Sequence, residues 1–454
     1  MNLAQFPRRG YVTTPTPIEH CPNFSKALGA DIDVYIKRDD MLPGTAGGNK
    51  TRKLDFCIAD ALQKGCDTVI TCGAVQSNHC RLTLSWAVHE GMDCHLVLEE
   101  RVKGSYNPEA SGNNFLFQLL GVKSITVVPG GSNMMEAMEK VAAKLTAEGR
   151  KPYIVPGGAS TPLGALGYVG CMEEIMHQMF EMGLNFDHMV VPSGSAGTHA
   201  GIIAGMIGNN INIPVTGIGV NRPKPVQENA VHTLANQTLD LLGVEARVPA
   251  EKVVAFDDYV GPGYSLPTDA MVEAVKMLAE TEGILLDPVY SGKAMSGLID
   301  LARKGYFAKG SKVLFLHTGG SPALYAYLPV TSPSCNPPPT HQPADVEGIC
   351  LKKKDSICMA VSWAVPYPWL YSSSALSGSV LRNAAVRSLS GPAPGWPSSS
   401  ACSLPAKRKI IALPPCAASA MKTVSSSSRP GCSPVCSASS WLPAVWWTAC
   451  SGWV

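Results

Sequence analysis

Short β-branched and apolar runs alternate with helix-length amphipathic segments between about residues 30 and 320. Segments such as 134–149 and 267–283 place apolar residues on one face and end in Gly, which predicts helices. Strands separated by helices pair in parallel and are covered on both faces. The chain is therefore predicted to be an α/β protein with parallel sheets, and its strands are predicted at residues 34–37, 67–73, 94–100, 124–130, 152–158, 188–194, 213–220 and 312–320.

The composition changes near Pro329. Beyond it the chain begins with a Pro/Ser-rich stretch, has no Asp or Glu after Asp355, and contains seven of the eight tryptophans. A solvated natural tail is usually acidic or mixed in charge and poor in tryptophan, and a domain would show patterned elements. Residues 329–454 are interpreted as an unpatterned, low-complexity tail, either non-native, through out-of-frame or read-through translation, or disordered. A genuine fused segment is the alternative.

Charge and hydropathy limit the partners that can be expected. The formal net charge is +2, from 37 Lys and Arg against 35 Asp and Glu, so no nucleic-acid partner is expected. No apolar run reaches the roughly 18 residues that span a bilayer, and the first residues lack a signal-peptide core. The seven cysteines before residue 329 show no paired zinc spacing, and no metal site is expected. A cytoplasmic protein that acts on a small molecule is predicted, without a membrane partner.

One strand end predicts a phosphate site. In parallel sheets, ligands bind beyond the carboxyl ends of the strands. The turn at 193–201 reads SGSAGTHAG, and its glycines and the N–H groups of a following helix would bind a phosphate. It lacks the Gly-Lys-Ser/Thr ending of a P-loop and the spacing of a dinucleotide site, so a single phosphomonoester fits better. A plain strand-to-helix turn is the alternative.

Other strand ends carry polar side chains. Ser77 and Asn78 begin a helix, where they would bind a carboxylate or a phenolate oxygen, or would simply cap that helix. The stretches LDPVYSGKAMSG at 286–297 and HTGGSPALYAY at 317–327 are weak signals individually. GGNKTRK, at 47–53, places lysines behind two glycines, where the alternatives are a solvated surface charge and a covalent anchor.

In their order along the chain, these motifs resemble one enzyme family. The stretches are IKRDD, GGNKTRKL, AVQSNH, GALGYV, SGSAGTHAG, DDYVGPGYSLPTD, GILLDPVYSGKAMSGL and LFLHTGGSPALYAY. Between about residues 5 and 328 they resemble the pyridoxal-phosphate enzymes of the tryptophan synthase β-type fold, PLP fold type II. The most similar branch holds D-cysteine desulfhydrase, L-cysteate sulfo-lyase and 1-aminocyclopropane-1-carboxylate deaminase. The resemblance implies a catalytic region at 1–328, with a large domain from 1–53 and about 165–328, a smaller inserted domain at about 54–164, and a homodimer.

The resemblance implies pyridoxal 5′-phosphate as the cofactor. Lys50 would be the Schiff-base lysine, with Asn49 beside it and Lys53 one turn further along the helix. A buried amine near other cations has a lowered pKa, which suits a nucleophile and then a base at the α-carbon. The residues that would bind the cofactor phosphate are Gly194, Ser195, Ala196, Gly197 and Thr198.

The same resemblance assigns the remaining roles. Thr318 or Ser291 would face the pyridine nitrogen, and a neutral hydroxyl there favours β-elimination over transamination. Asn78 would bind the ring's 3′ oxygen, and Tyr290 would lie over the ring face. Ser77 would bind the substrate carboxylate, and Tyr264 would lie near the reacting β-substituent.

The substrate is predicted from Ser291, which follows the tyrosine. The cyclopropane-opening deaminases typically have glutamate there, and desulfhydrase-like members have a small hydroxyl residue. We therefore expect a carbon–sulfur lyase that converts the small amino acid D-cysteine to pyruvate, ammonia and hydrogen sulfide. L-cysteate sulfo-lyase, which residues 98–113 also resemble, is the first alternative, and a sulfonate would need a cation such as His79 or Arg81. Next come the cyclopropane deaminase, an enzyme inactivated by its tail, and a cofactor-free protein that binds a phosphorylated metabolite.

Overall fold

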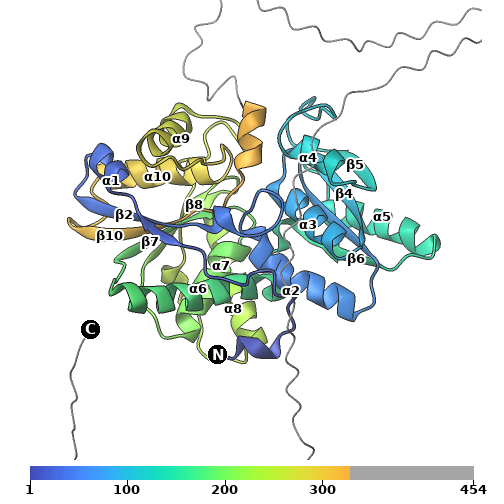
Figure 1. The fold of residues 1–454 in the computed structure, drawn as a ribbon, viewed down its shortest axis with the longest axis horizontal. Helices are drawn as coiled ribbons and strands as arrows, with labels where there is room; N and C mark the ends of the chain where they lie inside the picture. Colours follow the sequence, from blue (N-terminus) through green and yellow to red (C-terminus); the bar gives the residue numbers. More distant parts are fainter. Residues whose placement is uncertain (328–454) are drawn as a thin grey trace, which may run out of the picture. The chain divides into compact units, whose positions relative to one another are not determined.

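The computed structural model describes residues 1–327, so the predicted tail at 329–454 lies outside the described residues. Residues 1–327 belong to one compact unit with a six-stranded sheet, in the order β1-β2-β10-β7-β8-β9, and a four-stranded sheet, in the order β5-β4-β3-β6 (Figure 1). Helices and strands alternate along the chain, and the predicted α/β class is confirmed. The helices are α1 Pro22–Leu28, α2 Lys50–Gln63, α3 Asn78–His89, α4 Asn113–Leu119, α5 Met134–Ala147, α6 Pro162–Met182, α7 Gly197–Gly208, α8 Lys224–Leu241, α9 Asp269–Glu282 and α10 Ser291–Arg303.

The six-stranded sheet is parallel except at one edge, where β1 runs antiparallel to β2. Both edge strands, β1 and β9, are three residues long and were not predicted. Three residues are too few to show a period, so only the tertiary pairing defines these strands. The strands of this sheet are β1 Ile18–His20, β2 Ile32–Lys37, β7 His188–Ser193, β8 Val215–Gly219, β9 Val254–Phe256 and β10 Ser311–Leu316.

The four-stranded sheet is entirely parallel and uses residues 68–155. This range lies inside the inserted region predicted at about 54–164, and the domain boundaries themselves stay a prediction. Its strands are β3 Thr68–Ala74, β4 Asp93–Glu100, β5 Ser124–Pro129 and β6 Pro152–Val155.

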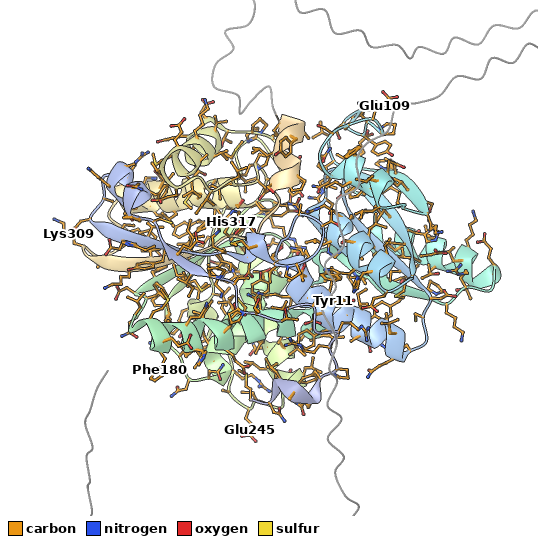
Figure 2. The ribbon with its side chains drawn as sticks, viewed as in Figure 1. Tyr11, Glu109, Phe180, Glu245, Lys309 and His317 are labelled. Atoms are coloured by element: carbon orange, nitrogen blue, oxygen red, sulfur yellow. The ribbon has the colours of Figure 1, made fainter. Side chains whose placement is uncertain are left out.

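Alternating side chains of β10 fill two cores. Val313 and Phe315 pack with α1, α9 and α10, whereas Leu314 and Leu316 pack with α6 and α7. In Figure 1 these helix groups lie on opposite faces of the larger sheet. Figure 2 shows Phe180 of α6 at the periphery, where it is 84% exposed. Helices cover both faces of the sheet, so these faces are apolar. A polar ligand site is therefore expected beyond the carboxyl ends of the strands.

Three helices start just beyond strands of the sheets and bring predicted site residues with them. Helix α3 follows β3, α7 follows β7, and α2 follows β2 after the short 3-10 helix η2 (Asp39–Met41). Within residues 1–327, no helix is both long and apolar enough to cross a bilayer.

Candidate active site

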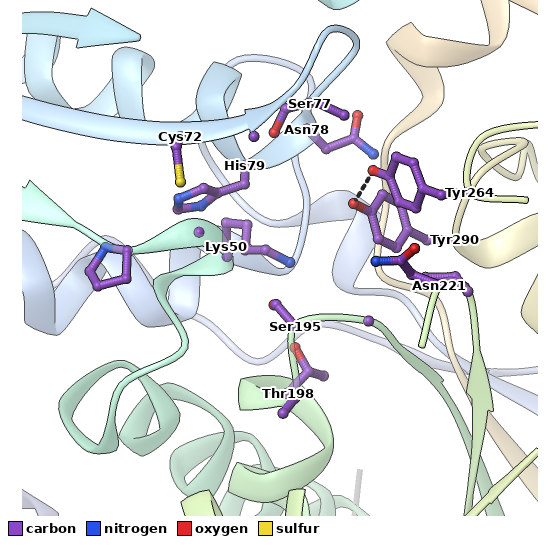
Figure 3. A pocket seen from close by; sticks show the side chains of 18 of the residues that line it. Lys50, Cys72, Ser77, Asn78, His79, Ser195, Thr198, Asn221, Tyr264 and Tyr290 are labelled. Atoms are coloured by element: carbon purple, nitrogen blue, oxygen red, sulfur yellow. Dashed lines mark hydrogen bonds between the residues drawn. The ribbon is translucent and has the colours of Figure 1, made fainter. Parts of the chain in front are cut away.

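A cavity of about 300 Å³ lies where these strand ends and helix starts meet. Figure 3 shows Lys50 within it, with Ser77 and Asn78 on one side and Ser195 and Thr198 on the other. Two of the predicted site residues, Gly197 and Ser291, do not line it. The predicted residues that do line it are Asn49, Lys50, Ser77, Asn78, Gly194, Ser195, Ala196, Thr198, Tyr264, Tyr290 and Thr318.

Lys50 is held in place through Asn49. The Lys50 Nζ donates to Asn49 Oδ1 at 2.9 Å, and Asn49 Nδ2 donates to Thr198 Oγ1 at 3.0 Å. The Asn49 backbone N–H donates to the carbonyl of Thr318 at 3.0 Å. The amine is therefore tied both to the glycine turn of α7 and to the turn after β10.

Burial makes Lys50 an unusual lysine. Its pKa falls to about 8 because the ammonium loses solvation, and the buried carboxylate of Asp287 opposes this shift. The sequence suggested that neighbouring cations would lower the pKa of Lys50, but Arg52 is not a cause of the shift. Its guanidinium points elsewhere and pairs with Asp39 and Glu174, at 2.8 Å each.

The pKa of Lys50 predicts how the cofactor-free protein takes up an aldehyde. Only a neutral amine attacks a carbonyl, so the uptake rate should rise with pH to about 8 and then level off, whereas an ordinary lysine continues to about 10. Stopped-flow absorbance after mixing the cofactor-free protein with pyridoxal phosphate measures this rate. A rate that still climbs steeply above about pH 9 would contradict the assignment.

The glycine turn after β7 forms an anion cradle. Ala196 has φ 75, a strained value for a residue with a side chain, and α7 starts at the next residue. A Cβ on Gly194 would lie 3.3 Å from Cε1 of Tyr290, so the missing side chain leaves room against that ring. The first N–H groups of a helix lack intrahelical acceptors. Gly197 lies outside the cavity lining, and its N–H donates to Ser160 Oγ at 3.1 Å.

Lys53 is the residue at this cradle whose role the sequence did not reveal. It is fully buried, and its Nζ donates to the carbonyl of Gly158 at 3.2 Å. A Cβ on Gly197 would lie 2.9 Å from the same Nζ, so the amine sits directly behind the turn. Burial, and then the charge of Lys50, hold the pKa of Lys53 well below its usual range. A phosphate at the turn would supply the missing counter-charge, so these residues fit a phosphate group.

Replacing Lys53 with Met should therefore weaken cofactor binding, since a charge-assisted contact contributes about 1.5–3 kcal/mol, or roughly 10- to 150-fold in affinity. Fluorescence titration of the cofactor-free protein with pyridoxal phosphate measures this. Lys64→Met is the matched control, because Lys64 follows the same helix but is exposed and pairs with Asp60. Equal affinities in both variants would remove Lys53 from the cradle.

The opposite wall combines a helix start with two tyrosines. Ser77 Oγ accepts the N–H of Cys80 at 3.1 Å, so Ser77 caps α3 while it also lines the cavity. Asn78 Oδ1 accepts from Asn113 Nδ2 at 2.8 Å. The hydroxyls of Tyr264 and Tyr290 meet at 2.6 Å (Figure 3). Burial raises the pKa of both phenols, which keeps their protons in place.

The structure separates the two candidates for the pyridine nitrogen. Ser291 is fully buried, and its hydroxyl donates to Asp287 Oδ1 at 2.8 Å. Thr318 lines the cavity and is 7% exposed. His317, labelled in Figure 2, is fully buried and fixes the turn around it. Its Nδ1 accepts the N–H of Gly319 at 3.1 Å and its Nε2 donates to the carbonyl of Leu285 at 2.9 Å. Of the two hydroxyls, only that of Thr318 is available to a ligand.

His79 and Arg81, which the sequence suggested as partners for a sulfonate, lie in different environments. Arg81 is fully buried outside the cavity lining, and its guanidinium donates to the carbonyls of Thr45 and Gly47, which shapes the loop before Lys50. His79 lines the cavity with its Nδ1 buried and without a hydrogen-bond partner within residues 1–327. The arginines that line the cavity are Arg101 and Arg222, which no spacing in the sequence identified.

Comparisons with known proteins agree with this geometry. The profile of the family described as "Pyridoxal-phosphate dependent enzyme" matches residues 11–319. A crystal structure of an ACC deaminase homologue is similar at 40% sequence identity and a TM-score of 0.65, over 72% of this chain and 95% of that one. A pyridoxal 5′-phosphate-dependent aspartate racemase shares the fold, at 16% identity and a TM-score of 0.50, over 67% of this chain and 90% of that one. The expected tryptophan synthase β-type fold and cofactor are thereby confirmed: the chain belongs to the pyridoxal-phosphate dependent enzyme family, and its cofactor is pyridoxal 5′-phosphate.

Proposed function

We propose that this enzyme eliminates a sulfur leaving group from a small β-substituted amino acid, with D-cysteine as its first candidate substrate. The observation that supports this most is the cavity arrangement around Lys50. An amine with a pKa of about 8 lies between a phosphate cradle and the N-terminus of α3, in a cavity that the hydrogen-bonded Tyr264–Tyr290 pair also lines. The proposed assembly is a cytoplasmic homodimer.

The cofactor, when bound, supplies an electron sink for the α-carbon of an amino acid. Lys50 then has two tasks, first as the amine that holds the cofactor and later as the base that accepts the α-proton at Nζ. A base with a pKa near the working pH is the most effective compromise between availability and strength. The start of α3 at Ser77 suits the substrate carboxylate, since a helix N-terminus attracts negative charge.

The remaining residues favour elimination. The Thr318 hydroxyl is neutral and does not hold a pyridine nitrogen protonated as a carboxylate would, so negative charge at the α-carbon is best relieved by prompt loss of a β-substituent. Tyr264 retains its proton and can donate it to the departing sulfur, with Tyr290 as its hydrogen-bond partner. For D-cysteine the sum is one water consumed and one pyruvate, one ammonia and one hydrogen sulfide produced.

L-Cysteate is the second candidate substrate, and one observation favours it. Arg101 lines the cavity and lies over the ring of Tyr264, where it could face a sulfonate. Cyclopropane opening is the third candidate, supported by the 40% identity to the ACC deaminase homologue.

The test is product release by the purified chain. Pyruvate would be assayed with D-cysteine, L-cysteine and L-cysteate, and 2-oxobutyrate with 1-aminocyclopropane-1-carboxylate. Pyruvate together with sulfide or sulfite is the expected result. Turnover of the cyclopropane alone would refute elimination of sulfur, and no turnover of any substrate by a protein that has bound its cofactor would refute the whole proposal.

A further inference from the structure

Arg101 lines the cavity beside Tyr264, and the sequence suggested no role for it. Arg101 Nε donates to Glu99 Oε2 at 2.6 Å. The other oxygen of Glu99 accepts the N–H of Gly131 at 2.9 Å, so Glu99 itself is fixed. The Cζ of Arg101 lies 4.1 Å from the centroid of the Tyr264 ring, which is a cation–π contact. The guanidinium is thus oriented by one carboxylate and one aromatic face.

The terminal nitrogens of Arg101 are free to bind a ligand. Only Nε forms a hydrogen bond or an ion pair with another residue of the described chain 1–327, which leaves Nη1 and Nη2 as donors. The side chain is 30% exposed, and the residue lines the cavity. The planar fork of an arginine matches oxyanions such as carboxylate, phosphate and sulfonate better than it matches a neutral thiol.

We propose that Arg101 binds the anionic β-substituent of L-cysteate, so that the site accepts a β-sulfonate in addition to the thiol of D-cysteine. This inference rests on the proposed elimination in the same cavity. The α-carboxylate is directed to the start of α3 at Ser77, and the β-substituent to Tyr264, two residues that come from different segments of the cavity wall (Figure 3). The guanidinium of Arg101 lies over the ring of Tyr264, the residue assigned to the leaving group.

The corresponding reaction balances without an oxidant or reductant. Lys50 accepts the α-proton, and the Cβ–S bond breaks with its electron pair on sulfur, so sulfite departs. One water is consumed, and L-cysteate yields pyruvate, ammonia and sulfite. Arg101 stabilises the negative charge that the sulfonate carries when it binds and when it leaves.

The experiment compares Arg101→Met with Arg222→Met in the full chain with its cofactor. Arg222 lines the same cavity and has no assigned role, so it controls for the loss of a positive charge there. The measurements are kcat/KM for L-cysteate and for D-cysteine, and calorimetric binding of 3-sulfopropanoate, which has a carboxylate and a sulfonate but no amine that could react.

Arg101→Met should lower kcat/KM for L-cysteate and the affinity for 3-sulfopropanoate by about 10- to 100-fold, with little change for D-cysteine. Arg222→Met should leave the ratio of the two kcat/KM values unchanged. Arg101→Lys keeps the charge without the planar fork, so it should lose less L-cysteate activity and 3-sulfopropanoate affinity than Arg101→Met. This partial recovery would show that the loss in Arg101→Met does not come from unfolding.

Two results would overturn the proposal: equal losses for both substrates in Arg101→Met, or a loss of 3-sulfopropanoate binding in Arg222→Met instead. Failure of the proposed function looks different. There, the wild-type protein would release pyruvate from neither substrate, and binding of 3-sulfopropanoate would still decide the role of Arg101.

Discussion

Lys50→Ala should reduce elimination by a factor of about 100 to 10,000, because it removes the amine that holds the cofactor and the base that accepts the α-proton. The variant should also bind pyridoxal phosphate only non-covalently. Borohydride reduction of the wild-type protein, followed by peptide mapping, should find the pyridoxyl group on Lys50. The same treatment of the variant should leave no fixed adduct.

Lys293 provides an internal control for that mapping. Burial lowers the pKa of Lys293 to about 8, as it does for Lys50. Yet the Nζ of Lys293 donates to the carbonyls of Val260 and Gly263, at 2.6 and 2.9 Å, and the residue does not line the cavity. Labelling of Lys293 would show that a low pKa alone selects the site, and labelling of any lysine other than Lys50 would refute the assignment of Lys50.

Gly47→Ala should destabilise the fold by about 2–5 kcal/mol, the sum of a left-handed backbone cost and an overpacking cost. Gly47 has φ +62, and a Cβ added there would lie 1.9 Å from the backbone oxygen of Asp40, which cannot move aside as a flexible side chain can. Arg81 also binds the carbonyl of Gly47, so the clash would disturb the loop that positions Lys50. Urea unfolding measures the stability change, and an elimination assay should show a parallel loss of activity.

Gly65→Ala separates the two costs. Gly65 has a similar φ of +67, and a Cβ added there would meet nothing within 4 Å. We expect this variant to lose only about 1–2 kcal/mol and to keep its activity. If Gly47→Ala and Gly65→Ala were equally stable, the contact between Gly47 and the Asp40 carbonyl would not contribute to stability. The loop before Lys50 would then be less tightly packed than the structure indicates.

Much of the fold followed from local patterns. Every predicted strand is present, and the helices predicted at 134–149 and 267–283 correspond to α5 and α9. These patterns are reliable because a strand buried on both faces needs a continuous apolar run, and an amphipathic helix needs one apolar face. The edge strands β1 and β9 escaped prediction because their pairing depends on neighbours distant in sequence.

The residues of the candidate site were harder to predict from the sequence than the fold. The local pattern does not separate Lys50 from Lys53, one helical turn further on, and only the family resemblance favoured Lys50. The structure places Lys50 in the cavity lining and Lys53 behind the glycine turn. Ser291 and Thr318 were equal candidates until the structure engaged Ser291 with Asp287. Arg101 could not be identified because its neighbour Tyr264 comes from a segment far along the chain.

The sequence by itself determined the strand–helix alternation, the glycine turns at the strand ends and the order of the motifs, and these specify the family and its cofactor. Those features are local: backbone freedom at glycine and the apolar period are properties of neighbouring residues. Only the tertiary structure decided which hydroxyl remains free and which arginines line the cavity, and it alone showed how burial lowers the pKa of Lys50. These depend on burial and on partners from distant segments, and both arise only when the sheets and helices pack together.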